Sequence, residues 1–216
     1  MDTASVPANL RPQLATCSGG YCVPDVFIGT AGRFVPPTCN SIGGGEGRCL
    51  HEKIPQVASQ SNLPQSTCAS FEKCVPCTNP IDGADTGSCH VSCDPGLARP
   101  KFVFPSCCDL GGASRGKCVP ASMVPSSEAS QLGTDTCSGG NLCAPTENLD
   151  PNFRPQTCTA FALVYFGNYS GVCLSDCLQF SGIQGLVIKQ GDCDGIHQCV
   201  PCYMPGGQPS GAPGCN

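Results

Sequence analysis

The sequence predicts a small, disulfide-rich protein that is mostly irregular, with short strands and short helices. We expect three tandem cysteine-rich units that together form an elongated molecule. Twenty-one of its 216 residues are cysteines, a density typical of secreted disulfide scaffolds. Glycine (27) and proline (21) are both frequent, which disfavours long helices and long strands. Because such a chain buries little apolar surface, we expect cystines to supply much of its stability.

The spacing of the cysteines indicates the repeat. Cys39 begins a group of four cysteines with gaps of ten, nineteen and six residues, and the same gaps return in a group that begins 69 residues later at Cys108. A third group, from Cys158, has gaps of fifteen, twenty and six. We expect the four cysteines of each group to pair locally. The predicted divisions are an N-terminal arm and half unit (1–38), a first unit with an extension and an insertion (39–107), a second unit (108–157) and a third unit with an extension (158–216).

Short elements are predicted in chain order. Residues 1–16 have the composition of an extended arm, and residues 17–22 match the end of a unit, as at 137–143. The segment 25–29 is a candidate strand. Two proline-initiated segments, 55–62 and 125–132, are candidates for one or two turns of helix.

Glycines cluster before the second cysteine of the first and second groups, at 43–47 and 111–116. Glycine adopts positive φ without steric cost, so we expect tight turns there. A phosphate-binding loop is disfavoured because the lysine and the following helix are missing.

Two Cys-Val-Pro-Cys motifs, at 74–77 and 199–202, have three possible interpretations. A thiol–disulfide exchange site needs a helix after the first cysteine, and Pro80 or Pro205 would break it. A zinc site would draw on the three histidines, which do not recur at matching positions. Framework cystines are favoured. The expected bonds beyond the groups are Cys77–Cys89, Cys202–Cys215 and Cys93–Cys107.

An odd number of cysteines leaves at least one thiol unpaired or bonded outside the chain. Cys177 has no counterpart in the other two groups, which makes it the candidate unpaired or intermolecular cysteine. The alternative is a buried free cysteine that acts as a small apolar side chain.

The third unit contains the candidate interface. Its first loop is five residues longer than that of the other units, and the addition is apolar throughout. Such a run is often a buried strand, but a small cystine-held unit has little core to receive it. The candidate interface residues are Phe161, Leu163, Val164, Tyr165 and Phe166. The following segment, 168–170, is a glycosylation sequon.

Composition excludes several classes of function. Charged residues make up 12% of the chain, the net charge is −5, and no basic cluster is present, so no nucleic-acid partner is expected. No apolar run reaches the length of a membrane span. No catalytic constellation and no cofactor motif is found, so we do not expect an enzyme. Oxygen ligands for calcium at Asn79, Asp82 and Asp85 have no counterpart in the matching loop.

These observations favour a secreted structural protein, with its signal peptide presumed removed, since cystines persist in an oxidising compartment. We expect it to associate with itself or with another extracellular protein in an extracellular assembly. One alternative is a monomeric extracellular binding module, such as an inhibitor or ligand, on a disulfide frame. A second alternative is a metal-binding protein that uses cysteine and histidine.

Overall fold

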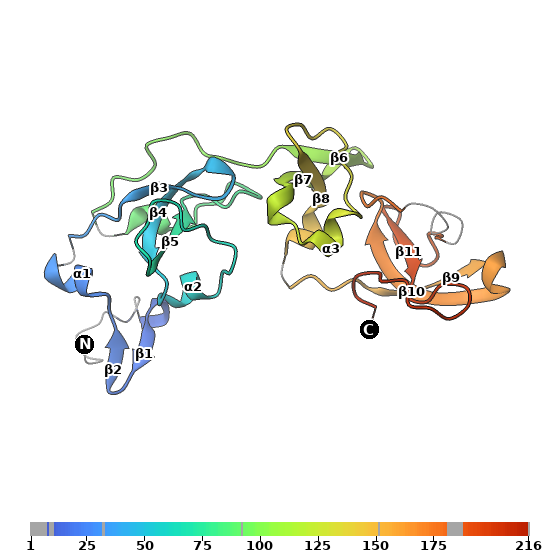
Figure 1. The fold of residues 1–216 in the computed structure, drawn as a ribbon, viewed down its shortest axis with the longest axis horizontal. Coiled ribbons are helices and arrows are strands. Elements are labelled where there is room, and N and C mark those ends of the chain that lie inside the picture. Colours follow the sequence, from blue (N-terminus) through green and yellow to red (C-terminus); the bar gives the residue numbers. More distant parts are fainter. Residues whose placement is uncertain are drawn as a thin grey trace. The chain divides into compact units, whose positions relative to one another are not determined.

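A computed structural model of the chain describes residues 8, 11–31, 33–91, 93–150, 152–180 and 188–215. It divides into two compact units, Met1–Phe104 and Pro105–Asn216, each described by itself below. Strands dominate the described residues, in one two-stranded and three three-stranded antiparallel sheets (Figure 1). The α-helices have four or five residues each. The structure is therefore small, disulfide-rich and built mainly from short strands.

The first unit begins with a hairpin of β1 (Ala15–Cys17) and β2 (Gly20–Cys22), preceded by the 3-10 turn η2 (Arg11–Gln13). The helix α1 (Asp25–Gly29) follows, where the sequence predicted a strand, so that prediction is wrong. Pro24 precedes the helix, the carboxylate of Asp25 lies in its first turn, and Thr30 donates a hydrogen bond of 2.7 Å to the carbonyl of Val26. Five residues are too few for helical periodicity to show in the sequence.

The main sheet of this unit has the order β3 (Thr38–Asn40), β4 (Glu46–His51) and β5 (Glu72–Pro76). Disulfide Cys39–Cys74 joins the outer strands, and Cys49–Cys68 joins the middle strand to the loop before β5. The turn η3 (Ile42–Gly44) has positive φ at two glycines, as predicted, and α2 (Pro55–Ala58) occupies the predicted helical segment.

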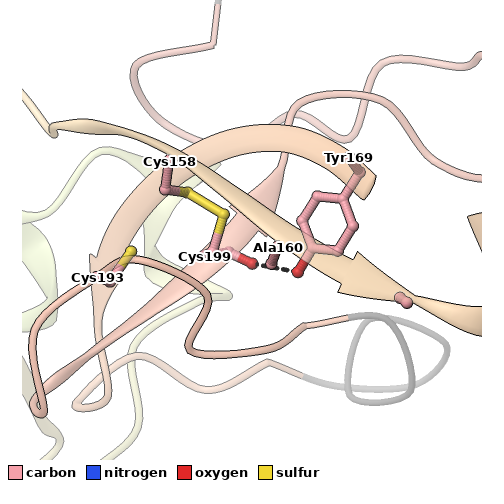
Figure 2. Close-up of a cluster of buried hydrophobic side chains, with 6 residues drawn as sticks. Cys158, Ala160, Tyr169, Cys193 and Cys199 are labelled. Carbon is pink, nitrogen blue, oxygen red and sulfur yellow. Dashed lines mark hydrogen bonds between the residues drawn. A yellow bond between two sulfur atoms is a disulfide. The ribbon is translucent and has the colours of Figure 1, made fainter. Parts of the chain in front are cut away.

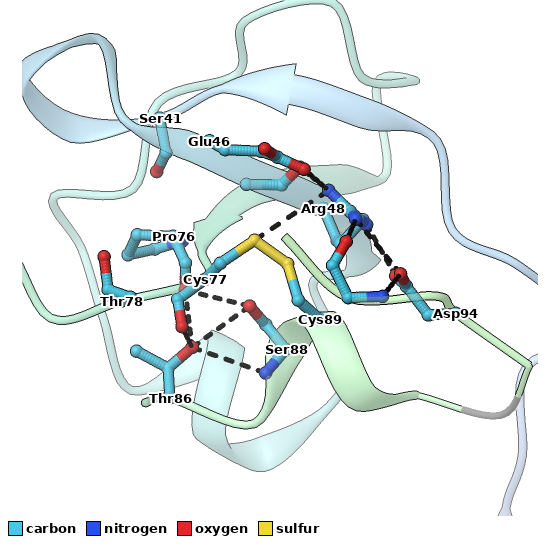
Figure 3. Close-up of a disulfide and its surroundings, with 12 residues drawn as sticks. Ser41, Glu46, Arg48, Pro76, Cys77, Thr78, Thr86, Ser88, Cys89 and Asp94 are labelled. Atoms are coloured by element: carbon cyan, nitrogen blue, oxygen red, sulfur yellow. Dashed lines mark hydrogen bonds and ion pairs between the residues drawn. A yellow bond between two sulfur atoms is a disulfide. The ribbon is translucent and has the colours of Figure 1, made fainter. Parts of the chain in front are cut away.

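A buried ion cluster holds the insertion of the first unit against β4 (Figure 3). Arg48 donates hydrogen bonds to Glu46 at 2.7 Å and to both carboxylate oxygens of Asp94, at 2.5 and 3.0 Å. The cluster lies beside the disulfide Cys77–Cys89, whose second cysteine is in the 3-10 turn η4 (Ser88–His90). Charged hydrogen bonds thus fix the segment that contains Asp94, which forms no strand.

The second unit contains two sheets. One has the order β6 (Ser106–Leu110), β7 (Ala113–Pro120), β8 (Asn141–Pro145), and the other has the order β11 (His197–Pro201), β10 (Gly167–Ser175), β9 (Thr157–Ala162). Between β7 and β8 lie η5 (Ala121–Met123) and α3 (Ser126–Ala129), the latter inside the second predicted helical segment. The turn η6 (Thr146–Leu149) follows β8, and η7 (Leu163–Tyr165) joins β9 to β10.

The disulfides of the second unit correct the predicted pairing. Cys107, not Cys108, bonds to Cys143, and Cys108 bonds to Cys177, while Cys118–Cys137 closes locally. The predicted bond Cys93–Cys107 is therefore wrong, and the predicted start of the second unit at Cys108 lies inside β6. Strand register explains the choice: Cys107 lies opposite Gly116 and projects over it, whereas Cys108 has a left-handed φ of 58° that directs its side chain elsewhere.

The remaining local bonds agree with the sequence. Cys158–Cys199 and Cys173–Cys193 close within the third group of cysteines. Cys77–Cys89 and Cys202–Cys215 close the two extensions, as predicted. Nine disulfides use eighteen of the 21 cysteines; Cys17, Cys22 and Cys93 are free and exposed.

One of the two buried clusters of the sheet β9–β10–β11 is made of cystines, alanines and one tyrosine (Figure 2). The other is aliphatic and contains Val172, Leu174, Leu178, Ile188 and Val200. Disulfide Cys158–Cys199 packs with Cys193 and Tyr169, and the hydroxyl of Tyr169 donates a hydrogen bond of 2.8 Å to the carbonyl of Cys199. The methyl group of Ala160 fills the remaining space. In this first cluster, sulfur and small side chains thus take the place that branched aliphatic residues have in an ordinary core.

Candidate functional site

The candidate site is the end of the β9–β10 hairpin, where the predicted interface residues lie. Phe161 ends the outward-facing row of β9, Leu163 and Val164 lie in η7, and Phe166 immediately precedes β10. Their exposed fractions are 59% for Phe161, 79% for Leu163, 45% for Val164 and 98% for Phe166. We call these four residues the apolar tip.

The large side chains face solvent because the inner face has no room for them. Along β9 the burial alternates, so that Ala160 and Ala162 face the cystine core while Phe161 faces outward. The inner face is already occupied by Tyr169 and by disulfide Cys158–Cys199. Phe161 therefore contributes little to this core.

Tyr165 differs from the other four predicted interface residues because it holds the tip in place. Its side chain is half-buried, its hydroxyl donates a hydrogen bond of 2.6 Å to the carbonyl of Tyr203, and its ring lies 4.9 Å from that of Tyr169. Burial raises the pKa of Tyr165, which keeps the hydroxyl a donor. Phe166 has a left-handed φ of 54°, and this conformation directs its ring into solvent.

No charged residue occurs between Arg154 and Asp176, the stretch that contains both strands of the hairpin. A partner that covered the tip would therefore bury no charge of this hairpin. The exposed Asn168 of the sequon lies opposite Phe161 across the two strands. A glycan on Asn168 would stand beside the tip.

The structure contradicts the other predicted site residue. Cys177 is neither unpaired nor available to another chain, because it bonds to Cys108 and packs against the cystine cluster of the β6–β8 sheet. Backbone contacts bring this loop close: Gln179 donates to the carbonyl of Gln131 at 2.8 Å. Because the sequence shows only spacing, it could not reveal a bond between the second and third groups.

Sequence reasoning missed an apolar groove in the first unit. The groove has a volume of about 480 Å³ and lies between α1 and the β3–β5 sheet. Three phenylalanines, Phe27, Phe34 and Phe71, line it together with His51. Its only sequence signal is the recurrence of phenylalanine around α1, which the mistaken strand prediction obscured.

The described acidic and sulfur clusters are occupied by structural contacts. Each described cluster with metal-ligand geometry contains cystine sulfurs, which are not thiolates, and at most one carboxylate. The loop oxygens of Asn79, Asp82 and Asp85 accept hydrogen bonds from backbone N–H groups two residues further on. These carboxylates and amides therefore stabilise turns.

Comparison of the chain with protein-family models, with curated proteins and with solved structures gives no match. None of the helices in the described part of the chain has the length and apolar character needed to cross a bilayer. The geometry of the site is thus the only basis for a functional proposal.

Proposed function

We propose that the chain is a secreted structural protein of three tandem disulfide-closed units, which assembles with copies of itself through the apolar tip. The observation that carries this proposal is the exposure of four large apolar side chains at one hairpin end. Contiguous exposed apolar residues on a soluble protein are typical of interaction sites. Tyr165 is the fixed base from which the tip projects.

The unit organisation is supported by matching features in the three three-stranded sheets. In each sheet a cysteine of the first strand bonds to a cysteine of the third, and a cysteine of the middle strand bonds to the loop that follows it. In each sheet a glycine of the middle strand lies opposite the first cysteine, and these glycines are Gly47, Gly116 and Gly171. Nine disulfides also favour an oxidising, extracellular environment.

The energetics favour association through the tip. Burying one large apolar side chain completely contributes about 1.5–3 kcal/mol, and each 1.4 kcal/mol changes a dissociation constant about tenfold. The tip contains no charge that would need to be desolvated. A fixed hairpin end also loses little conformational entropy on binding.

Sedimentation velocity over a concentration series tests this proposal on unglycosylated protein. We expect the native chain to form oligomers as concentration rises, and we expect Phe166→Ser to raise the dissociation constant at least tenfold. Phe161→Ser and Leu163→Ser should act in the same direction. Far-UV circular dichroism and intact mass would verify that each variant keeps its fold and its nine disulfides.

Met123→Ser is the matched control, because Met123 is also exposed and lies in the same unit but away from the β9–β10 hairpin in the sequence. This variant should associate like the native chain. A native chain that stays monomeric at the highest concentration, or equal weakening by the tip and control variants, would refute self-assembly through the tip.

The groove at Phe27, Phe34 and Phe71 favours a second function, a monomeric extracellular binding module. Apolar, concave sites of this volume are typical of ligand or peptide recognition. A chain that remains monomeric and retains an apolar peptide through Phe71 would support this alternative. Loss of retention in Phe71→Ser, with no change in Phe166→Ser, would separate the two functions.

A further inference from the structure

Two of the free cysteines lie together on the β1–β2 hairpin. The register pairs Cys17 with Gly20 and Ala15 with Cys22. Residues two apart on a strand share a face, so Cys22 lies on the same face as Gly20 and hence as Cys17. The two thiols are diagonal neighbours across the hairpin.

The side chains of this pair are accessible to solvent. Cys17 and Cys22 are both exposed, and the strand register places them as diagonal neighbours on one face of the hairpin. The neighbouring Cys17 raises the pKa of Cys22. The turn between the strands contains Gly19, which has a φ of 81°, and a Cβ added to this glycine would meet no atom within 4 Å. The turn therefore has space to adjust.

The hairpin differs from its counterpart in the second unit. There the corresponding cysteines, Cys137 and Cys143, bond to Cys118 and Cys107 on preceding strands. All other cysteines of the given sequence except Cys93 are already paired. The adjacent free thiol for Cys17 is therefore that of Cys22, and the reverse also holds.

We propose that Cys17 and Cys22 form an exposed dithiol–disulfide couple that exchanges with small thiols and disulfides of the glutathione type. The thiolate of one cysteine attacks a sulfur of the external disulfide, which forms a mixed disulfide and releases one small thiol. The second cysteine then attacks the protein sulfur of the mixed disulfide and releases the second small thiol. The two cysteines lose two electrons and two protons in total, and the external disulfide is reduced to two thiols.

Geometry makes this bond more labile than the framework. Diagonal residues across a hairpin have Cα atoms about 7–8 Å apart, whereas disulfides need about 4.4–6.8 Å, so oxidation must tighten the hairpin. Exposed and strained disulfides are reduced more readily than buried ones. Eight of the nine framework bonds contain at least one buried cysteine, and both cysteines of the ninth, Cys202–Cys215, are half-buried. The couple should therefore open and close while the nine framework bonds persist.

The test uses the full chain with Cys93→Ser, which leaves two thiols. The protein is equilibrated in buffers with stepped ratios of reduced to oxidised glutathione, then alkylated and measured by intact mass and by non-reducing peptide mapping. We expect both thiols to disappear together, so that the oxidised chain takes up no alkyl group and its mass lies two hydrogen atoms below that of the dithiol form before alkylation. A peptide linking Cys17 to Cys22 should appear. The change should reverse in reducing buffer before any framework bond opens.

Cys17→Ser and Cys22→Ser, each in the same background, are the matched controls and should accumulate only the mixed disulfide. The proposal is overturned if both thiols persist in oxidised glutathione, if both carry glutathione without a Cys17–Cys22 link, or if the link opens only together with the framework. Because the couple lies in the first unit and the apolar tip in the second, this outcome is independent of self-assembly.

Discussion

Arg48 is a buried cation whose donors are fully used by the first unit. Besides Glu46 and Asp94, its guanidinium donates a hydrogen bond of 2.7 Å to the carbonyl of Gly96. Burial alone would raise the pKa of Glu46, but hydrogen bonds from Arg48 and from the backbone N–H groups of residues 98 and 99 outweigh it and lower that pKa. The hydrogen bond from Arg48 lowers the pKa of Asp94.

We predict that Arg48→Met lowers the free energy of unfolding of the first unit by about 3–5 kcal/mol, because two buried carboxylates lose their cation. Carboxyl groups with lowered pKa contribute stability that is present above their unfolded pKa and is lost as pH falls through the folded pKa. The difference between native chain and variant should therefore be largest at neutral pH and should shrink on acidification. Guanidinium denaturation at stepped pH measures both.

Lys53→Met is the control for this prediction. Lys53 forms a pair with Glu52 at 4.0 Å, but its side chain is 77% exposed. Exposed pairs contribute less than about 1 kcal/mol, so this variant should unfold like the native chain. A similar loss in both variants would show that the buried cluster has no special role.

At the scale of elements, the sheets depend on glycines that lie beneath disulfides. A Cβ at Gly116 would lie 2.8 Å from the Sγ of Cys143 and 2.9 Å from the Sγ of Cys107. The disulfide can cross the sheet there only because the middle strand has no side chain. This explains why glycine occupies a strand position that otherwise favours larger residues.

Gly116→Ala should lower the free energy of unfolding of the second unit by about 1–3 kcal/mol, because the added methyl overpacks the site. Gly195→Ala is the matched control, since Gly195 has no atom within 4 Å of its would-be Cβ and no positive φ. Circular dichroism during guanidinium denaturation compares them with disulfides intact. Unchanged stability of Gly116→Ala would contradict the close approach.

The same sheets show how far sequence spacing predicts structure. Equal gaps aligned Cys39 with Cys108, but the β6–β7 hairpin is one residue longer than β3–β4, so Cys107 is the residue that faces its glycine. Spacing predicted the local bonds of the first and third groups because the first cysteine of each group is also the one that faces the glycine of the middle strand. It could not place Cys108–Cys177, which depends on a left-handed backbone.

The apolar tip shows a second limit of sequence reasoning. The run from Phe161 to Phe166 is apolar throughout, so alternation could not show which side faces inward. The structure places the small Ala160 and Ala162 inward and the large Phe161 outward. This arrangement depends on the volume that cystines occupy, which emerges only when the pairing is known.

At the scale of the whole molecule, tertiary contacts within Pro105–Asn216 join its two sheets. Disulfide Cys108–Cys177 is one link, and His197 is another. His197 on β11 contacts Glu147 of η6 at 2.9 Å through Nε2 and Asp194 at 2.5 Å through Nδ1. Arg115 of β7 also acts electrostatically on Asp194. We therefore expect the stability of the second unit to depend on pH.

Burial alone would lower the pKa of His197, but hydrogen bonds to Asp194 and Glu147 outweigh it and raise that pKa. A histidine with raised folded pKa contributes stability that is fully present below its unfolded pKa, about 6.5, and is lost as pH rises through the folded pKa. We predict that the second unit loses about 0.5–1 kcal/mol as pH rises above 6.5, since both carboxylates are partly exposed.

His197→Gln should remove this pH dependence, because glutamine keeps polar contacts but does not titrate. His90→Gln is the control: His90 forms an exposed pair with Asp85 in the first unit, and its loss should leave the slope of the second unit unchanged. Guanidinium denaturation at stepped pH from 5.5 to 8.5 measures the slope. If His197→Gln retains the native slope, another group makes the stability of the second unit depend on pH. If the slope disappears, the contact between β11 and η6 depends on the protonated imidazole of His197.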